Sequence, residues 1–298
     1  MKKKIDLFDI CNTLFMLVVL FIILYPLYYT VIASVSSGNE VAKGNVTWFP
    51  IGFNLDAYRN IIAEKKIWVG YANTIFYTVV GTLFNLVLTI PAAYAMSKKQ
   101  LPHRGFIMTL FLITMYFSGG MVPTYLLVKS LGLINTRTVI IVLGGLSVYN
   151  MIVTRTYFST GISDTLFEAA EIDGAGELKK FFRIALPLAK PITAVMVLYY
   201  AVGRWNSYFN ALLYVSNPDY EPLQSVLRRI LILNETMEDF MLGSGASADE
   251  LLHSVQMANM AYSMKYAVVF IASAPLLIAY PFIQKYFVKG VMVGALKE

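Results

Sequence analysis

The sequence predicts an all-α integral membrane protein with six transmembrane helices. The 298 residues are 57% hydrophobic but only 14% charged, and the apolar residues are concentrated in six long stretches. Soluble domains carry about 25% charged residues, so this chain has too few charges to cover a water-facing surface of its size. Each stretch is close to or longer than the roughly 20 residues that a helix needs to cross a bilayer.

The predicted transmembrane helices occupy residues 12–36, 70–97, 105–128, 138–158, 188–214 and 262–283. The first follows a run of lysines, as a secretory signal would, but its apolar core from Leu14 to Ala33 exceeds the usual length of about 7–15 residues. We therefore expect residues 1–36 to be a retained N-terminal anchor helix. The whole chain, 1–298, is predicted to be a single transmembrane domain with its core at 70–283.

The Lys and Arg residues predict the orientation of the chain, because they are enriched in cytoplasmic segments. With the N-terminus placed inside, most of the 24 basic residues fall in the inner segments, while the acidic residues divide almost evenly between the two sides. The net charge of +6 then lies on the inner side. Both termini, including the tail at 284–298, are therefore predicted to be cytoplasmic.

The two longest outer segments are predicted to contain short helices. Residues 37–69 have the pattern of an interfacial helix that ends at Trp68, and residues 215–261 predict a helix with Pro222 at its first position. These helices either cover the outer ends of the spans or dock an external partner.

The predicted spans lack the groups that ion-driven carriers commonly use. They contain no Asp or Glu, and both histidines, His103 and His253, fall in loops. None of the 19 glycines is followed by Lys, which excludes a G-x-x-x-x-G-K-[ST] phosphate loop. One Cys and two His leave too few ligands for a zinc site. We therefore expect a non-catalytic, pore-forming subunit without a metal site of its own. A sodium site made of backbone carbonyls stays open as an alternative.

The longest inner loop, residues 159–187, is predicted to form two short helices joined at a glycine. Thr165 and Glu168 have the spacing of a capping box at the start of the first helix. Gly174 predicts its end, because a left-handed conformation costs a residue with a Cβ about 1–2 kcal/mol. The second helix is expected from Glu177 to about Ile184.

The same loop contains a spaced motif. Glu168-Ala169-Ala170 is followed after three residues by Gly174, and after nine more by Ile184-x-Leu186-Pro187. These residues resemble the EAA loop of ABC importer permeases. Trp205-Asn206 and the tail from Tyr286 to Lys297 resemble the carbohydrate-uptake branch, specifically the maltose-permease-G-like subunits. The resemblance extends over residues 12–297, although the chain ends in Glu298 where many relatives end in Gly. The alternative is an amphipathic segment that rests on the inner leaflet.

This resemblance implies the fold of the ABC importer permeases, a bacterial plasma-membrane location and a role in ATP-driven carbohydrate import, with oligosaccharides favoured. The implied partners are a second, different permease subunit, two ATPase subunits that bind ATP and Mg²⁺, and an extracytoplasmic sugar-binding protein. In the family, the loop forms coupling helices that sit in a cleft of the ATPase. The implied coupling residues are Glu168, Ala169, Ala170, Asp173, Gly174, Ile184, Leu186 and Pro187.

Polar and aromatic residues within the spans are candidates for the substrate path, since amides pair with sugar hydroxyls and aromatic faces pack against sugar rings. The candidates are Trp205, Asn206, Tyr208, Asn150, Tyr116 and Asn85. Hydrogen bonds between helices are the alternative explanation for any one of them. Arg204 is the only cation well inside a span, which disfavours phosphate or amino-acid substrates. Gly119-Gly120 and Gly144-Gly145 allow either close packing or helix bending.

Three other functions stay open at this stage: a non-sugar ABC importer permease, a secondary carrier and a membrane scaffold that transports nothing. The missing carboxylates argue against a secondary carrier, and the intact EAA-like loop argues against a scaffold. If the protein is a secondary carrier, an ionophore would abolish uptake. If it is a scaffold, replacing pore-facing aromatic residues would not change uptake.

Overall fold

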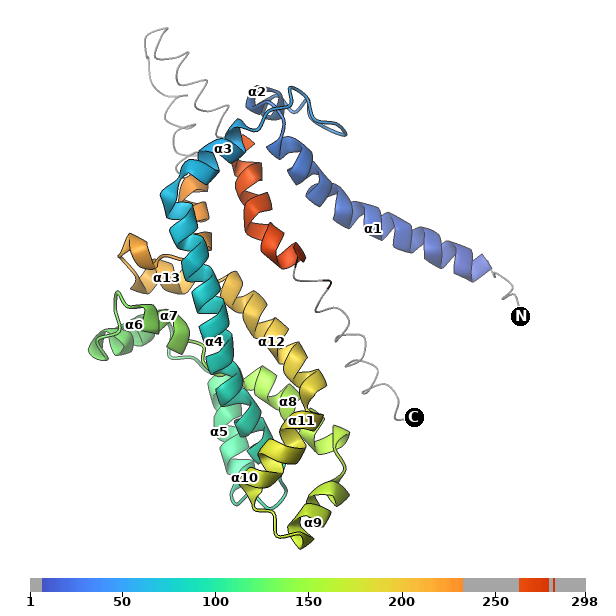
Figure 1. Cartoon of the computed structure of the whole chain (residues 1–298), viewed down its shortest axis with the longest axis vertical. Helices are drawn as coiled ribbons and strands as arrows, with labels where there is room; N and C mark the ends of the chain where they lie inside the picture. Colours follow the sequence, from blue (N-terminus) through green and yellow to red (C-terminus); the bar gives the residue numbers. More distant parts are fainter. Residues whose placement is uncertain (1–6, 233–262, 279–280, 282–298) are drawn as a thin grey trace. The chain divides into compact units, whose positions relative to one another are not determined.

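The computed structural model describes residues 7–232, 263–278 and 281. All regular elements among these residues are helices (Figure 1), in agreement with the predicted all-α class. The chain divides into two compact units, Met1–Ile67 with Leu227–Pro275 and Trp68–Val226 with Leu276–Glu298. The predicted tail at 284–298 lies outside the described residues.

The first unit contains α1 (Leu7–Ser34), α2 (Gly38–Ala42), α3 (Asp56–Ala63) and most of the helix Ser263–Ile278. Only the C-terminal end of α1 is buried, where Ile32 and Ala33 pack with Val41 and Val46. The Ser263 hydroxyl donates to the carbonyl of Ser36 at 3.0 Å. The rest of α1 exposes apolar side chains, as a lipid-facing anchor helix would.

The second unit holds most of α4 (Lys65–Ser97) and the helices that follow it. These are α5 (Arg104–Tyr116), α6 (Met121–Ser130), α7 (Arg137–Val142), α8 (Val148–Gly161), α9 (Asp164–Ile172), α10 (Glu177–Lys180), α11 (Leu186–Leu188), α12 (Lys190–Trp205) and α13 (Phe209–Tyr214). A π-helical turn, η1 (Phe181–Ala185), joins α10 to α11, and a 3₁₀ turn, η2 (Pro218–Tyr220), follows α13. A further helix occupies residues 223–232, and the boundary between the two units, after Val226, falls within it.

Two of the described helices, α1 and α4, are long and apolar enough to cross a membrane. Two bent pairs raise the number to four if each pair is one span: α5 with α6, bent by 111°, and Glu177–Leu188 with Lys190–Trp205, bent by 77°. The last predicted span contains the shorter apolar helix Ser263–Ile278. The count of six spans therefore stays a prediction.

Three predicted spans are interrupted rather than continuous, which corrects the sequence-based expectation. The stretch 105–128 breaks between α5 and α6, 138–158 breaks between α7 and α8, and 188–214 breaks between α12 and α13. The reason is that apolarity places a segment in the membrane but does not require unbroken helix, provided that other groups satisfy the freed backbone.

The two glycine pairs have different roles at two of these breaks. Gly120 has φ +87° and caps the N-terminus of α6, and Gly144 has φ +70° in the turn after α7. Gly145 instead permits close packing, because a Cβ there would lie 2.7 Å from Phe84 of α4. Bending and close packing therefore both occur, at neighbouring positions.

The outer helices begin and end slightly differently from the prediction. α3 ends at Ala63 and Trp68 lies in α4, so the interfacial helix is shorter than expected. The helix at 223–232 begins one residue after Pro222.

Candidate coupling loop and substrate path

The first loop helix, α9, begins two residues earlier than a Thr165 capping box requires. Its N-cap is Ser163, and no side-chain cap hydrogen bond is formed there. The Ser163 and Thr165 hydroxyls are instead hydrogen-bonded to each other at 2.8 Å. The predicted capping box is therefore wrong, because Thr165 already lies within the helix.

The end of α9 has the glycine stop that the sequence predicts. Gly174 has φ +70°, and its N–H donates to Glu171 O at 2.9 Å. The next N–H, of Ala175, donates to Ala170 O at 2.8 Å. These two bonds make a Schellman motif, which satisfies the last carbonyls of α9 and turns the chain sharply.

The second helical segment is continuous from Glu177 to Leu188 but contains the π turn η1. Pro187 lies in its last turn, α11, and the chain then bends by 77° at Ala189 into α12. The loop is thus set off from the following span by a sharp corner rather than continuing straight into it.

The predicted coupling residues divide into an exposed and a packed set. Glu168, Ala169, Asp173, Gly174 and Pro187 are exposed, Ala170 is buried, and Ile184 and Leu186 are half-buried. The structure adds two exposed apolar side chains that the sequence reasoning did not single out: Ile172 at 88% and Leu178 at 76% exposure, one on each side of the Gly174 corner. Their place next to Gly174 can be read from the sequence, but their exposure is known only from the fold.

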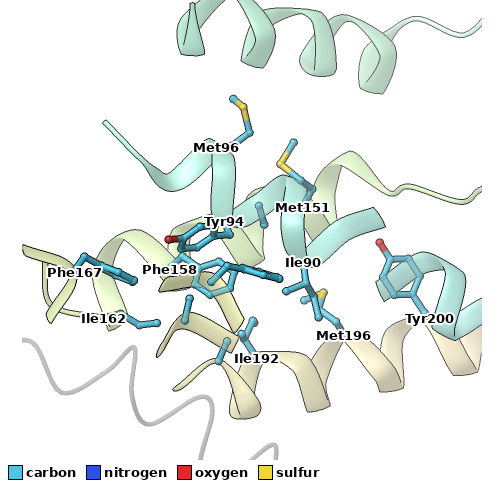
Figure 2. Packing of buried hydrophobic residues seen from close by; sticks show 14 residues of the cluster. Ile90, Tyr94, Met96, Met151, Phe158, Ile162, Phe167, Ile192, Met196 and Tyr200 are labelled. Atoms are coloured by element: carbon cyan, nitrogen blue, oxygen red, sulfur yellow. The ribbon is translucent and has the colours of Figure 1, made fainter. Parts of the chain in front are cut away.

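The packed face of the loop belongs to a buried cluster around Tyr94, near the C-terminal end of α4. Figure 2 shows Tyr94 beside Phe158 of α8 and Phe167 of α9. The Tyr94 ring centroid lies 5.7 Å from that of Phe158, 6.1 Å from Phe167 and 5.1 Å from Phe181 of η1. One tyrosine of α4 therefore contacts both helical segments of the loop.

A polar cluster lies beside these rings. Lys180 Nζ donates to Glu171 Oε2 at 2.9 Å and to Glu177 Oε1 at 3.0 Å, and the Tyr94 hydroxyl donates to Glu177 Oε2 at 3.2 Å. The Lys180 side chain is only 5% exposed, whereas both carboxylates are largely exposed. We call Tyr94, Glu171, Glu177 and Lys180 the Lys180 cluster.

The charges in this region shift one another's pKa values. Hydrogen bonds to Glu171 and then Glu177 raise the pKa of Lys180. Partial burial opposes the ionisation of Glu177, but hydrogen bonds from Lys180 and Tyr94 outweigh it and lower the pKa of that carboxyl. Burial lowers the pKa of Lys98, whose Nζ lies 3.2 Å from the Phe167 ring centroid. Lys180 and Glu177 are therefore held in their charged forms near neutral pH.

Among the substrate-path candidates, three gather at the break between α12 and α13. Trp205 ends α12 and is buried, Asn206 is the exposed C-cap, and Tyr208 precedes α13 with 39% exposure. The Trp205 ring lies 6.3 Å from that of Tyr71 in α4. This is the combination of amide and aromatic groups that sugar binding uses.

The other three candidates lie in different surroundings. Tyr116 is 75% exposed at the end of α5, and Asn150 is buried in the first turn of α8. Asn85 is fully buried, its Nδ2 donates to Gly144 O at 2.7 Å and to Gly145 O at 2.6 Å, and its Oδ1 accepts from Arg204. Both ends of the Asn85 amide are thus engaged by the protein, and we remove it from the path.

Arg204 is satisfied almost entirely by backbone carbonyls at the end of α7. Its guanidinium donates to Ile140 O and Leu143 O from Nη1, and to Ile141 O at 2.9 Å and Gly144 O at 3.4 Å from Nη2. Nε donates to Asn85 Oδ1 at 3.0 Å. We call Arg204, Asn85 and these four carbonyls the Arg204 cluster. Its donors are used within the protein, so Arg204 is not a free anion site.

Comparisons with known proteins agree with this architecture. Residues 67–293 match the model of the family described as "binding-protein-dependent transport system inner membrane component". The chain is 38% identical to protein LplC of Bacillus subtilis (strain 168), over 97% of this chain and 95% of the relative. It is 37% identical to the polygalacturonan/rhamnogalacturonan transport system permease protein YtcP of the same organism, over the full length of both.

A solved structure is also similar: a bacterial ABC transporter involved in the import of the acidic polysaccharide alginate. The TM-score is 0.82 at 31% sequence identity, and the match covers 96% of this chain and 99% of that chain. The chain therefore belongs to the family of inner-membrane components of binding-protein-dependent transport systems, the permease subunits of ABC importers.

Proposed function

We propose that this permease subunit forms half of the translocation path of an ATP-driven oligosaccharide importer, and that residues 159–187 couple it to a separate ATPase. In this proposal the chain crosses the membrane six times with both termini in the cytoplasm. It pairs with a second permease subunit, two ATPase subunits and an extracytoplasmic binding protein. ATP and Mg²⁺ are bound by the ATPase.

The coupling proposal rests on one observation: the loop has one packed face and one exposed apolar face. One side packs into the cluster around Tyr94, while Ile172 and Leu178 expose apolar surface beside the Gly174 corner. In the proposed complex the ATPase covers these side chains, and burying one of them is worth about 1.5–3 kcal/mol. A cleft on the ATPase that accepts this corner would gain that free energy and would contact Glu168 and Asp173 on the same exposed side.

The substrate proposal rests on the relatives and on the groups at the break between α12 and α13. The relatives include permeases named for arabinooligosaccharides, galactooligosaccharides and maltodextrin. Trp205, Asn206 and Tyr208 supply the corresponding aromatic and amide groups. Two of the similar proteins are named for acidic polysaccharides, polygalacturonan and alginate. Uronate-containing oligosaccharides are therefore the first substrates to test, with cations for their carboxylates supplied by the partner subunits.

The substrate class is tested with the assembled complex and its binding protein. We expect oligogalacturonides or alginate oligosaccharides to stimulate ATP hydrolysis more than maltodextrins of the same length do. Stimulation by maltodextrins alone would contradict the acidic preference, and stimulation by no saccharide would contradict the carbohydrate assignment.

The coupling role is tested with Gly174→Val and Glu168→Lys. Valine at φ +70° costs about 1–2 kcal/mol locally and distorts the corner, and lysine reverses an exposed charge on the docking side. Both variants should insert normally but lose uptake while ATP hydrolysis continues. Gly176→Val is the matched control, because Gly176 has φ −68° and a Cβ there meets nothing within 4 Å. Normal uptake by both test variants would contradict the coupling role.

A further inference from the structure

We propose that the Lys180 cluster fixes the coupling loop to the C-terminal end of α4, so that movement of the loop is transmitted to α4 as well as to the span that follows it in sequence. This inference rests on the proposed coupling function and names the element that receives the movement. Lys180 and Glu177 act in it as positioning residues, since they hold the loop without contacting substrate or nucleotide.

Chain connectivity alone would send the movement into α12, which follows the loop directly. The junction at Ala189 is bent by 77°, however, and a corner transmits a push less directly than a continuous helix does. The loop also contacts α4, through aromatic side chains. Phe167 and Phe181 both lie against Tyr94, and Lys98, just after α4, lies over the Phe167 ring.

The hydrogen bonds of the Lys180 cluster join the two loop helices to each other. Lys180 joins Glu171 at the end of α9 to Glu177 at the start of α10, on opposite sides of the Gly174 corner. Glu177 uses its other oxygen to accept the Tyr94 hydroxyl. A push on either helix is therefore shared by both and reaches α4 through one tyrosine.

Burial distinguishes this cluster from ordinary surface ion pairs. The Lys180 side chain is 5% exposed, so its ammonium would lose its partners without regaining full hydration if they were removed. Lys99 and Asp164 also join the end of α4 to α9, at 3.2 Å, but their side chains are 80% and 68% exposed. A pair that exposed is screened by water and holds two elements weakly.

The receiving helix leads to the candidate substrate path. Asn85, nine residues before Tyr94 in α4, belongs to the Arg204 cluster, and the Trp205 side chain follows Arg204 directly in α12. Nine residues of helix span about 13 Å. α4 thus connects the loop to the break where Trp205, Asn206 and Tyr208 gather.

The test measures saccharide transported per ATP hydrolysed, using the complete complex in proteoliposomes with its binding protein and the oligosaccharide that stimulates best. Lys180→Met keeps the length of the side chain but removes its charge and donors. We expect this ratio to fall by roughly 2- to 30-fold, the range that coupling variants show, with ATP hydrolysis changed less than about twofold. Lys180→Arg, which keeps two or more donors, should restore most of the ratio.

Two further variants keep the test decisive. Lys129→Met makes the same substitution at an exposed lysine of α6 and should match the wild type. Tyr94→Phe removes only the hydroxyl that donates to Glu177 and should lower the ratio of saccharide transported to ATP hydrolysed, by less than Lys180→Met does. This variant still tests the inference if the Lys180→Met complex does not assemble.

The outcomes separate this inference from the proposed function. An unchanged ratio in both Lys180→Met and Tyr94→Phe would overturn the transmission through α4, as would an equal fall in transport and ATP hydrolysis. Saccharide stimulation of the wild type together with uncoupling by Gly174→Val would leave the proposed function intact in either case. Absence of saccharide stimulation in the wild type would count against the proposed function itself.

Discussion

Two buried cations of the second unit, Lys180 and Arg204, are held by different kinds of partner. Lys180 is 4% exposed and bonds to two carboxylates that themselves reach water. Arg204 is 9% exposed and bonds to four backbone carbonyls and an amide oxygen. The first cation lies in the predicted cytoplasmic loop and the second lies in a predicted span.

Lys180 and Arg204 have different kinds of partner because water reaches the partners of Lys180, whereas those of Arg204 lie in predicted spans. A carboxylate in a loop that reaches water keeps part of its hydration, whereas one inside the bilayer would have to be desolvated, which is costly. Within the predicted span, the short helix α7 instead ends with its last carbonyls accepting from the guanidinium. These carbonyls carry the negative end of the helix dipole and need donors, so each side satisfies the other.

The largest effect should come from Arg204→Met, which removes all the donors of the Arg204 cluster. Carbonyls at the end of α7 and the Asn85 oxygen would then be buried without partners, at about 1–3 kcal/mol for each unsatisfied group. We expect a loss of at least about 3 kcal/mol and a large fall in the yield of assembled complex, measured by size-exclusion chromatography. Arg204→Lys should be intermediate, because an ammonium reaches fewer acceptors. A wild-type yield from the methionine variant would show that the carbonyls find other donors.

Asn85→Leu should have the next largest effect. It removes the donor to Gly144 O and Gly145 O and one acceptor of Arg204, but leaves the other bonds of the guanidinium in place. We expect a loss of about 2 kcal/mol, seen as a lower thermal unfolding temperature of the purified complex. An unchanged unfolding temperature would mean that Asn85 is not a structural residue and would return it to the list of path candidates.

Gly145→Ala tests the close packing of the same region without touching its polar bonds. The new Cβ would lie 2.7 Å from Phe84 Cε1 and 3.2 Å from Leu88 Cδ1, which predicts a loss of about 1–3 kcal/mol. Gly119→Ala is the matched control, since the nearest atom to its Cβ would be 3.8 Å away. Equal unfolding temperatures for the two variants would show that α4 can move aside at Gly145.

The smallest effect should come from Lys99→Met, which breaks an exposed ion pair near the Lys180 cluster. Its partner Asp164 is also exposed, so we expect less than about 1 kcal/mol and no change in transport per ATP beyond measurement error. A fall as large as that of Lys180→Met would mean that exposure does not separate the two lysines, and the comparison of buried with exposed pairs would fail.

The sequence predicted the all-helical class and the glycine end of α9 well, because both depend on local signals. Long apolar stretches marked the membrane segments, and Gly174 marked the end of α9 because only glycine accepts φ +70° without cost. The resemblance at Glu168, Gly174 and Pro187 agrees with the family match over residues 67–293.

What the sequence could not show depends on contacts between distant residues. The break at Gly144 is stabilised by Arg204, which lies sixty residues later in the sequence. Hydropathy does not reveal such a contact, so it predicted one continuous helix at 138–158. Asn85 appeared as a path residue because its partners, Gly144 and Arg204, are known only from the fold. Ile172 and Leu178 are ordinary apolar residues until the fold shows that nothing in the described chain covers them.

The most direct test of the central claim is the number of oligosaccharides imported per ATP hydrolysed by the reconstituted complex, for the wild type and for Gly174→Val. We expect uptake by the wild type that requires ATP and is insensitive to ionophores. We also expect near-zero uptake by Gly174→Val while ATP hydrolysis continues. Uptake that an ionophore abolishes, or an unchanged ratio in Gly174→Val, would contradict the claim that this loop converts the ATPase cycle into transport.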